Sequence, residues 1–158
     1  MTTSRRGWFQ PLRYDPWAHL GQMQGQLRVT LLWHDDGNMG ETNFDNRTVS
    51  LRRGMTVAQR RSTLAHELVH VDRGPVPAGT TPCEEVLADL TAAQRMISPS
   101  IIRDLPELVD KHGQSAAQDF LEIDREMLES ALRLIKMSRA DGWEWNDDRR
   151  GQNQAARP

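Results

Sequence analysis

The segment TVAQRRSTLAHELVHVDRG, residues 56–74, decides the fold. It opens with a capping box, in which Thr56 caps a helix and Gln59 reaches back to it, and it ends at Gly74, which is followed by a proline. Between these signals, apolar residues recur at helical spacing. We therefore predict a helix over this segment with one buried stripe, formed by Val57, Leu64, Leu68 and Val71.

Within this helix, residues 66–70 have the pattern H-E-x-x-H. His66 and His70 are one turn apart and project to the same side, so both imidazoles could reach one Zn²⁺ at about 2.0–2.1 Å. Glu67 lies beside them, where it could take a proton from water on the metal. The pattern predicts a metal site with Glu67 as the catalytic base. The alternative is a pair of core histidines beside a surface glutamate.

A second helix is predicted from residues 81–84, which we interpret as another capping box with proline at its first position. Glu84 is used by that capping box, whereas Glu85 and Asp89 are four residues apart and share a face. A catalytic zinc site takes three protein ligands and a water. We therefore predict Glu85 as the third metal ligand and Asp89 as the acceptor of a ring N–H of His66. The alternative for both acids is ordinary helix surface.

The rest of the chain predicts an α+β fold with a small, mostly antiparallel sheet of about three strands, packed on these two helices. The strands are expected at residues 27–33, 41–44 and 48–51, and further helices at residues 16–24, 100–112, 116–121 and 124–139. This gives one domain over residues 14–140. It comprises a catalytic core at 27–98 and C-terminal helices at 100–140, with tails at 1–13 and 141–158, the last residues being expected to be disordered.

Composition narrows the function classes. The chain has 158 residues and a net charge of -2, from 20 Lys and Arg against 22 Asp and Glu, so direct nucleic-acid binding is not expected. Its longest apolar stretches are about five residues, where about 20 are needed to span a bilayer. Cys83 is the only cysteine and excludes an intrachain disulfide. No apolar segment follows the basic residues near Met1, and we expect a cytoplasmic protein.

Three segments together resemble the ImmA/IrrE-type zinc metallopeptidases, particularly short forms from actinobacteria and their phages. They are residues 60–70, residues 72–74, and the spacing of Glu85, Asp89, Ala92 and Ala93. The resemblance covers residues 14–136. It implies a zincin-like fold, that of a minimal gluzincin, with Zn²⁺ on His66, His70 and Glu85 and with Glu67 catalytic. It also implies a transcriptional repressor as the protein substrate, cleaved in the host cytoplasm if the chain is phage-encoded.

The leading hypothesis is thus a zinc-dependent endopeptidase that acts on a regulatory protein. The alternative is a non-catalytic binding protein that acts on a repressor or DNA through its C-terminal helices, although the helix expected at 124–139 carries too many acids to suit a phosphate backbone. A third hypothesis is a structural zinc site closed by a fourth ligand, Asp72 or Cys83. The sequence leaves the donor to the oxyanion open among Tyr14, His34 and His112, and it does not predict the oligomeric state.

Overall fold

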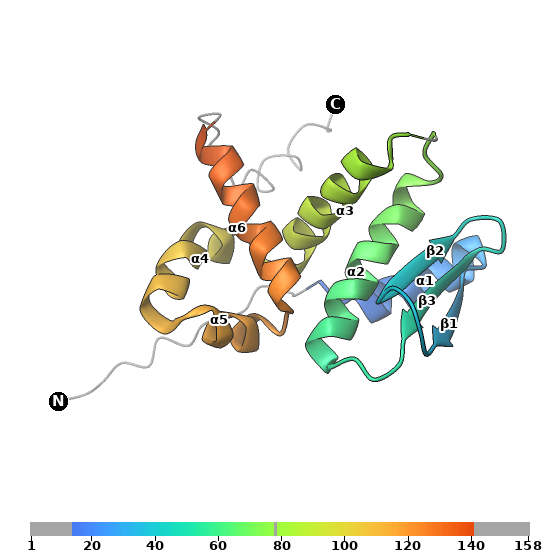
Figure 1. Ribbon diagram of the computed structural model, residues 1–158, viewed down its shortest axis with the longest axis horizontal. Helices are drawn as coiled ribbons and strands as arrows, with labels where there is room; N and C mark the ends of the chain where they lie inside the picture. Colours follow the sequence, from blue (N-terminus) through green and yellow to red (C-terminus); the bar gives the residue numbers. More distant parts are fainter. Residues whose placement is uncertain (1–13, 78, 141–158) are drawn as a thin grey trace, which may run out of the picture.

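The structure, a computed structural model, describes residues 14–77 and 79–140. It has an α+β fold that is mostly helical, with the sheet and α1 at one end, α4–α6 at the other, and α2 and α3 between them (Figure 1). The elements in chain order are α1 (Pro16–Leu27), β1 (Thr30–His34), β2 (Gly40–Asn43), β3 (Thr48–Arg52), α2 (Val57–Arg73), α3 (Thr81–Met96), α4 (Pro99–His112), α5 (Gln114–Leu121) and α6 (Arg125–Ala140).

The capping box predicted for α2 is confirmed. The backbone N–H of Gln59 donates to Thr56 Oγ1 at 3.1 Å, and the backbone N–H of Thr56 donates to Gln59 Oε1 at 2.9 Å. These bonds satisfy two of the N–H groups that a helix start leaves without partners. Of the predicted stripe on α2, Leu64 and Leu68 are fully buried, but Val57 is exposed because it lies in the first turn, beyond the sheet.

The capping box predicted for α3 is wrong. The helix begins at Thr81 after Thr80, and no side chain caps its first turn. Glu84 is turned inward and bonds to Arg73 of α2. A contact between Arg73, which is exposed, and Glu84, which is buried, takes the place of the local capping interaction, because a charged partner offers the carboxylate a stronger hydrogen bond.

The sheet is mixed, so the prediction of a mostly antiparallel sheet is wrong in this respect. The strand order is β1-β3-β2, with β3 parallel to β1 and antiparallel to β2. Val49 and Leu51 of β3 are fully buried, which suits a central strand, whereas β2 has the polar sequence GETN and lies at an edge. Placing β2 outside β3 leaves β1 and β3 side by side and running in the same direction.

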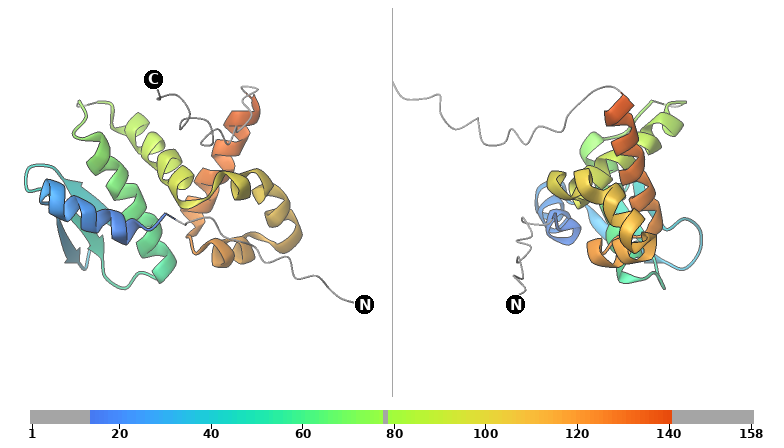
Figure 2. Two further views of the ribbon diagram at one scale, coloured as in Figure 1. Left: turned by 180° about the vertical axis from the view of Figure 1, so that it is seen from behind. Right: turned by 90° about the vertical axis from the view of Figure 1, so that its left-hand side faces the viewer.

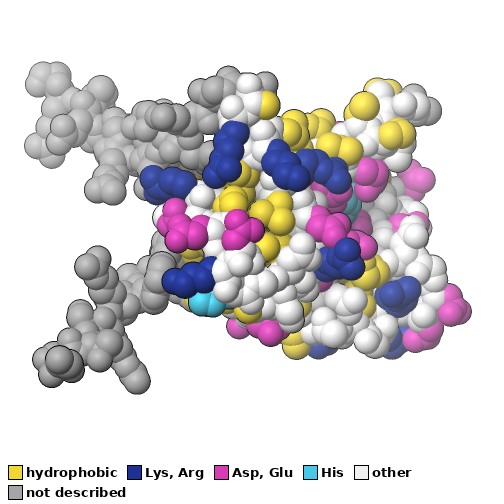
Figure 3. All heavy atoms as spheres, turned by 60° about the vertical axis from the view of Figure 1, so that its left-hand side comes forward, with side chains coloured by type: hydrophobic (Ala, Val, Ile, Leu, Met, Phe, Trp, Pro, Cys, Tyr) yellow, Lys and Arg dark blue, Asp and Glu magenta, His cyan; other side chains and the backbone are white. Residues whose placement is uncertain are grey.

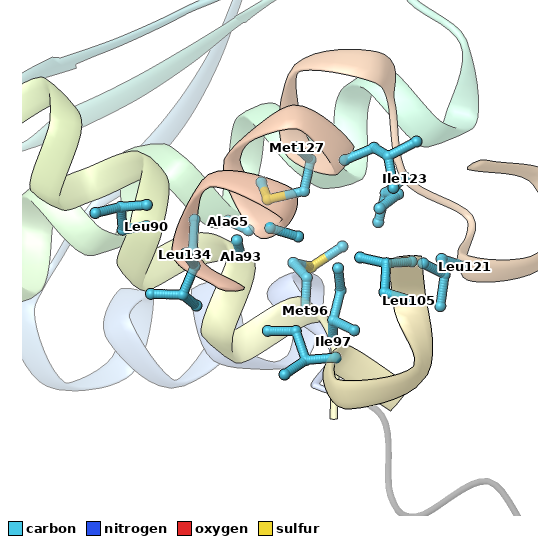
Figure 4. Close-up of a cluster of buried hydrophobic side chains, with 14 of the residues drawn as sticks. Ala65, Leu90, Ala93, Met96, Ile97, Leu105, Leu121, Ile123, Met127 and Leu134 are labelled. Carbon is cyan, nitrogen blue, oxygen red and sulfur yellow. The ribbon is translucent and has the colours of Figure 1, made fainter. Parts of the chain in front are cut away.

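Two clusters of buried apolar side chains meet on α2. Leu64 and Leu68 face the sheet and α1, which cover one side of the helix (Figure 2). Ala65 and Val69 face the other way, into a larger cluster with α3–α6. In that cluster side chains from five helices converge, among them Met96 and Met127 (Figure 4). The H-E-x-x-H motif is therefore on a helix that is packed on both sides.

The C-terminal helices begin and end close to their predicted positions. The predicted tails at 1–13 and 141–158 lie outside the described residues. In the part of the chain that the structure describes, no helix is both long and apolar enough to cross a membrane.

Candidate metal centre

The structure brings together the three side chains predicted as metal ligands. His66 and His70 project from α2 toward the first turns of α3, and their Nε2 atoms are 3.0 Å apart. Glu85 of α3 reaches both rings, with Oε2 at 3.2 Å from His66 Nε2 and Oε1 at 3.5 Å from His70 Nε2. Ligand atoms at two corners of a tetrahedron around zinc lie about 3.3 Å apart. The group could therefore hold a metal ion.

Asp89, one turn beyond Glu85, lies where the sequence predicts it, with Oδ1 at 2.9 Å from His66 Nδ1. A proton on Nδ1 satisfies this carboxylate and leaves Nε2 unprotonated toward Glu85 and His70. Burial lowers the pKa of His66, but the hydrogen bond to Asp89 and the charges of the surrounding carboxylates outweigh burial and raise it. The imidazole is thus oriented with Nε2 toward the position that a cation would take.

Glu67 is buried, with 6% of its surface exposed, although it stands next to two half-buried histidines. Thr42 of β2 donates its hydroxyl to Glu67 Oε2 at 2.7 Å. Burial raises the pKa of Glu67, while the Thr42 hydrogen bond and the two histidines lower it, and the net direction is upward. The carboxylate is therefore fixed in position and made more basic than an exposed glutamate, which suits a group that accepts a proton.

Gly40 allows β2 to approach this carboxylate. A Cβ atom at position 40 would lie 2.5 Å from Thr63 Cγ2 and 2.7 Å from Glu67 Oε1. Glycine is therefore favoured here because the side chains of Thr63 and Glu67 lie against the backbone of β2, a close approach of the kind for which glycine occurs inside strands.

A contact between Arg73 and Glu84 joins α2 and α3 beside the ligands. Arg73 Nη2 donates to Glu84 Oε2 at 2.9 Å, and Arg73 Nε donates to Glu84 Oε1. The Arg73 guanidinium holds the pKa of Glu84 below its usual range. Arg73 lies three residues after His70 and Glu84 immediately before Glu85, so this two-pronged contact fixes the ligand-bearing segments of the two helices relative to each other.

The ligand group opens into a pocket of about 570 Å³. Its walls come from β2, α2, the start of α3 and the start of α6, and Glu67 lines it together with the three ligands. Among the described residues, neither Asp72 nor Cys83 belongs to the ligand group. Asp72 instead forms an ion pair with Arg95, with Oδ2 at 2.6 Å from Nη1, and Cys83 is exposed. Three ligands beside an open pocket are typical of a catalytic rather than a structural metal site.

The three residues left open as oxyanion donors do not line this pocket. The hydroxyl group of Tyr14 contacts His19 Nδ1 at 2.7 Å, His34 Nε2 lies 2.8 Å from the carbonyl oxygen of Asn38, and His112 ends α4. The sequence analysis missed the roles of Thr42, Gly40, Arg73 and Glu84. Only the glycine within a short strand gave a signal that could have indicated a close approach.

The chain matches no protein-family model, and a search of curated proteins gives no match. The case for a function therefore rests on the geometry of this site and on the sequence resemblance.

Proposed function

We propose that the chain is a zinc-dependent endopeptidase of the ImmA/IrrE type with a zincin-like fold. The observation that carries the proposal is the triangle of His66, His70 and Glu85, whose ligand atoms are 3.0–3.5 Å apart. Glu67 lies beside this triangle, and the pocket gives access to it. Two imidazoles and one carboxylate form a ligand set known from zinc peptidases.

The chemistry divides between the ion and the protein. Zinc, when bound, lowers the pKa of water to about 7 and polarises a carbonyl group. Glu67 takes the proton from the attacking water and passes it to the leaving amine. The burial that raises the pKa of Glu67 favours the first of these transfers, because a more basic carboxylate takes the proton from water more readily. Thr42 and Asp89 hold Glu67 and His66 in position.

The substrate is a polypeptide in extended form. Within the sheet β2 pairs only with β3, and residues of β2 form one wall of the pocket. An extended peptide can add to such an edge through backbone hydrogen bonds. The resemblance favours a transcriptional repressor as the protein cleaved. The single cysteine favours the cytoplasm as the place of cleavage.

The Glu67→Gln variant tests the proposal. It should retain the metal of the wild type, measured by elemental analysis of the purified protein. Its kcat/KM on a quenched-fluorescence peptide library should fall by about 10²–10⁴-fold, because a general base contributes that much. Glu129→Gln is the matched control, since Glu129 is an exposed glutamate of α6 that bonds to Arg125 and does not line the pocket.

Proteolysis at the wild-type rate in Glu67→Gln would remove Glu67 from the mechanism. If Glu67→Gln and His66→Ala both kept full regulatory activity in cells, the chain would act as a binding protein and not as a peptidase.

A further inference from the structure

Acidic residues outside the ligand group also line the pocket. Glu41 of β2 does so, as do Asp124 and Glu126 at the start of α6, and among the described residues no lysine or arginine lines the pocket. Glu84 also lines it, but Arg73 balances its charge. Among the described residues, no ion pair is found for Glu41, Asp124 or Glu126. These three acidic residues therefore line the pocket with no ion-pair partner among the described residues.

The pKa of Asp124 also reflects its acidic surroundings. Burial raises the pKa of Asp124, and the negative charge of Glu126 raises it further. Hydrogen bonds from the backbone of Met127 and from Ser62 act in the opposite direction without cancelling the rise. A cation placed near Asp124 and Glu126 would relieve the smaller part of this rise, which comes from the charge of Glu126.

A second pocket, of about 470 Å³, adjoins the first at the far end of β2. Thr42 and Phe44 line both pockets. The second pocket contains Arg28 and Arg47, has no acid in its lining, and includes the apolar side chains Leu27, Val29, Val71 and Pro75. The two pockets thus form a groove along β2 with carboxylates at one end and guanidinium groups at the other.

The direction of β2 determines which end of the groove lies near the first residue of the strand and which lies near the last. Gly40 begins the strand next to Thr63, and the adjacent Ser62 accepts a hydrogen bond from the backbone of Asp124 at 3.0 Å. Asn43 ends the strand and lines only the basic pocket. Over the face shown in Figure 3, basic and acidic side chains are mixed. The separation of charge between the two pocket linings is therefore not repeated over this face.

We propose that the groove selects peptides with an asymmetric charge distribution. A lysine or arginine occupies the side of the cleaved bond that lies against Glu41, Asp124 and Glu126. Apolar or acidic residues occupy the side that lies against Arg28 and Arg47. If the peptide pairs antiparallel to β2, as strands do more often, the basic residue follows the cleaved bond. The inference rests on the proposed function and adds the substrate class to it.

Two synthetic peptides of identical composition test this. One has acidic residues before a central apolar pair and basic residues after it, and the other has the reverse order. The dissociation constant of each is measured by fluorescence anisotropy on zinc-loaded Glu67→Gln, so that the reading does not require turnover. We expect one order to bind roughly tenfold more tightly, as an estimate for carboxylates that line a solvent-accessible pocket. Raising the salt concentration from about 0.1 M to about 1 M, which shortens the Debye length from about 10 to about 3 Å, should abolish the difference.

Glu126→Gln should reduce the preference about 2- to 5-fold, whereas Glu129→Gln, on the same helix but outside the pocket, should leave it unchanged. Equal affinity for the two peptides, binding of neither, or equal effects of the two variants would overturn the inference. Failure of the proposed function can be distinguished from failure of this inference. If wild type cleaved both peptides at one rate, the peptidase would stand without the charge selection. If wild type cleaved neither while one order still bound more tightly, the groove preference would stand without the peptidase.

Discussion

Among single residues, Asp89 has the clearest influence on the metal site without being a ligand. Its carboxylate is 2.9 Å from His66 Nδ1 and so determines which ring nitrogen carries the proton. Without that partner, the imidazole can rotate and adopt the tautomer that blocks Nε2. Loss of the partner should therefore weaken metal binding while leaving all three ligands in place.

We expect Asp89→Ala to lower zinc affinity about 10–100-fold, the usual effect of removing such a partner. Competition with a chromophoric chelator measures this directly. Asp104→Ala is the control, because Asp104 is exposed on α4 and does not line the pocket. Wild-type affinity in Asp89→Ala would mean that the Asp89 contact does not orient His66.

The effect of Asp124 on the stability of the fold can be tested without a bound metal. It caps α6 by accepting a hydrogen bond from the backbone N–H of Met127 at 2.9 Å. Its pKa is raised above the usual 3.8, chiefly by burial. When a carboxyl pKa is higher in the folded state, the ionised group costs stability, so the protein loses stability as the pH rises through the folded pKa.

Asparagine can accept the same capping bond without carrying the charge. Asp124→Asn should therefore be more stable than wild type at pH 7, and the difference should vanish below pH 3.8. Asp124→Ala, which loses the cap, should be destabilised by about 1 kcal/mol. Urea unfolding of the three proteins across this pH range gives the comparison, and a difference that grew toward acid pH would contradict the assignment.

Between elements, the approach of β2 to α2 places the hydroxyl group of Thr42 on the carboxylate of Glu67, the proposed general base. Gly40→Ala should push Glu67 or Thr63 aside, because the new Cβ atom would overlap both side chains. We expect a loss of kcat of at least about tenfold with unchanged metal content, since a displacement of about 1 Å can cost 10²-fold. Gly21→Ala is the matched control. Its Cβ atom meets nothing within 4 Å, and alanine within α1 should stabilise the protein by roughly 0.5–1 kcal/mol.

Elements and contacts that depend on neighbouring residues could be predicted from the sequence, whereas those that depend on packing between elements could not. The start of α2 follows from Thr56 and Gln59, which interact with their own neighbours, and the ligand pair follows from helical spacing. The order of the strands in the sheet does not follow from local sequence, because it depends on which strand packs against the buried core. Glu84 shows the limit most clearly, since its local sequence favours a cap and its actual partner, Arg73, comes from another helix. Thr42 likewise acquires its role only when β2 packs on α2.

At the scale of the whole molecule, α2 is the element on which both apolar clusters depend. Ala65 and Val69 join the helical cluster, while Leu64 and Leu68 join the sheet cluster. The helical cluster contains Ile102 of α4, and α3 packs on α6 as well as on α2. Removing α4–α6 would therefore expose the cluster that α3 needs, so a truncated chain is a poor test of the binding-protein alternative. Point variants in the metal site are the better test.

A metal ion bound by His66, His70 and Glu85 joins α2 to α3 and should stabilise the entire fold. Free zinc at 100 times its dissociation constant contributes about 2.7 kcal/mol, which for a chain of this size raises Tm by about 5–10 °C. Differential scanning fluorimetry with zinc and with a chelator measures the shift. His66→Ala should lose most of it, whereas His112→Ala, at the far end of α4, should keep it. Equal shifts in wild type and His66→Ala would show that the stabilising ion binds elsewhere, and would remove the metal centre on which the proposed function depends.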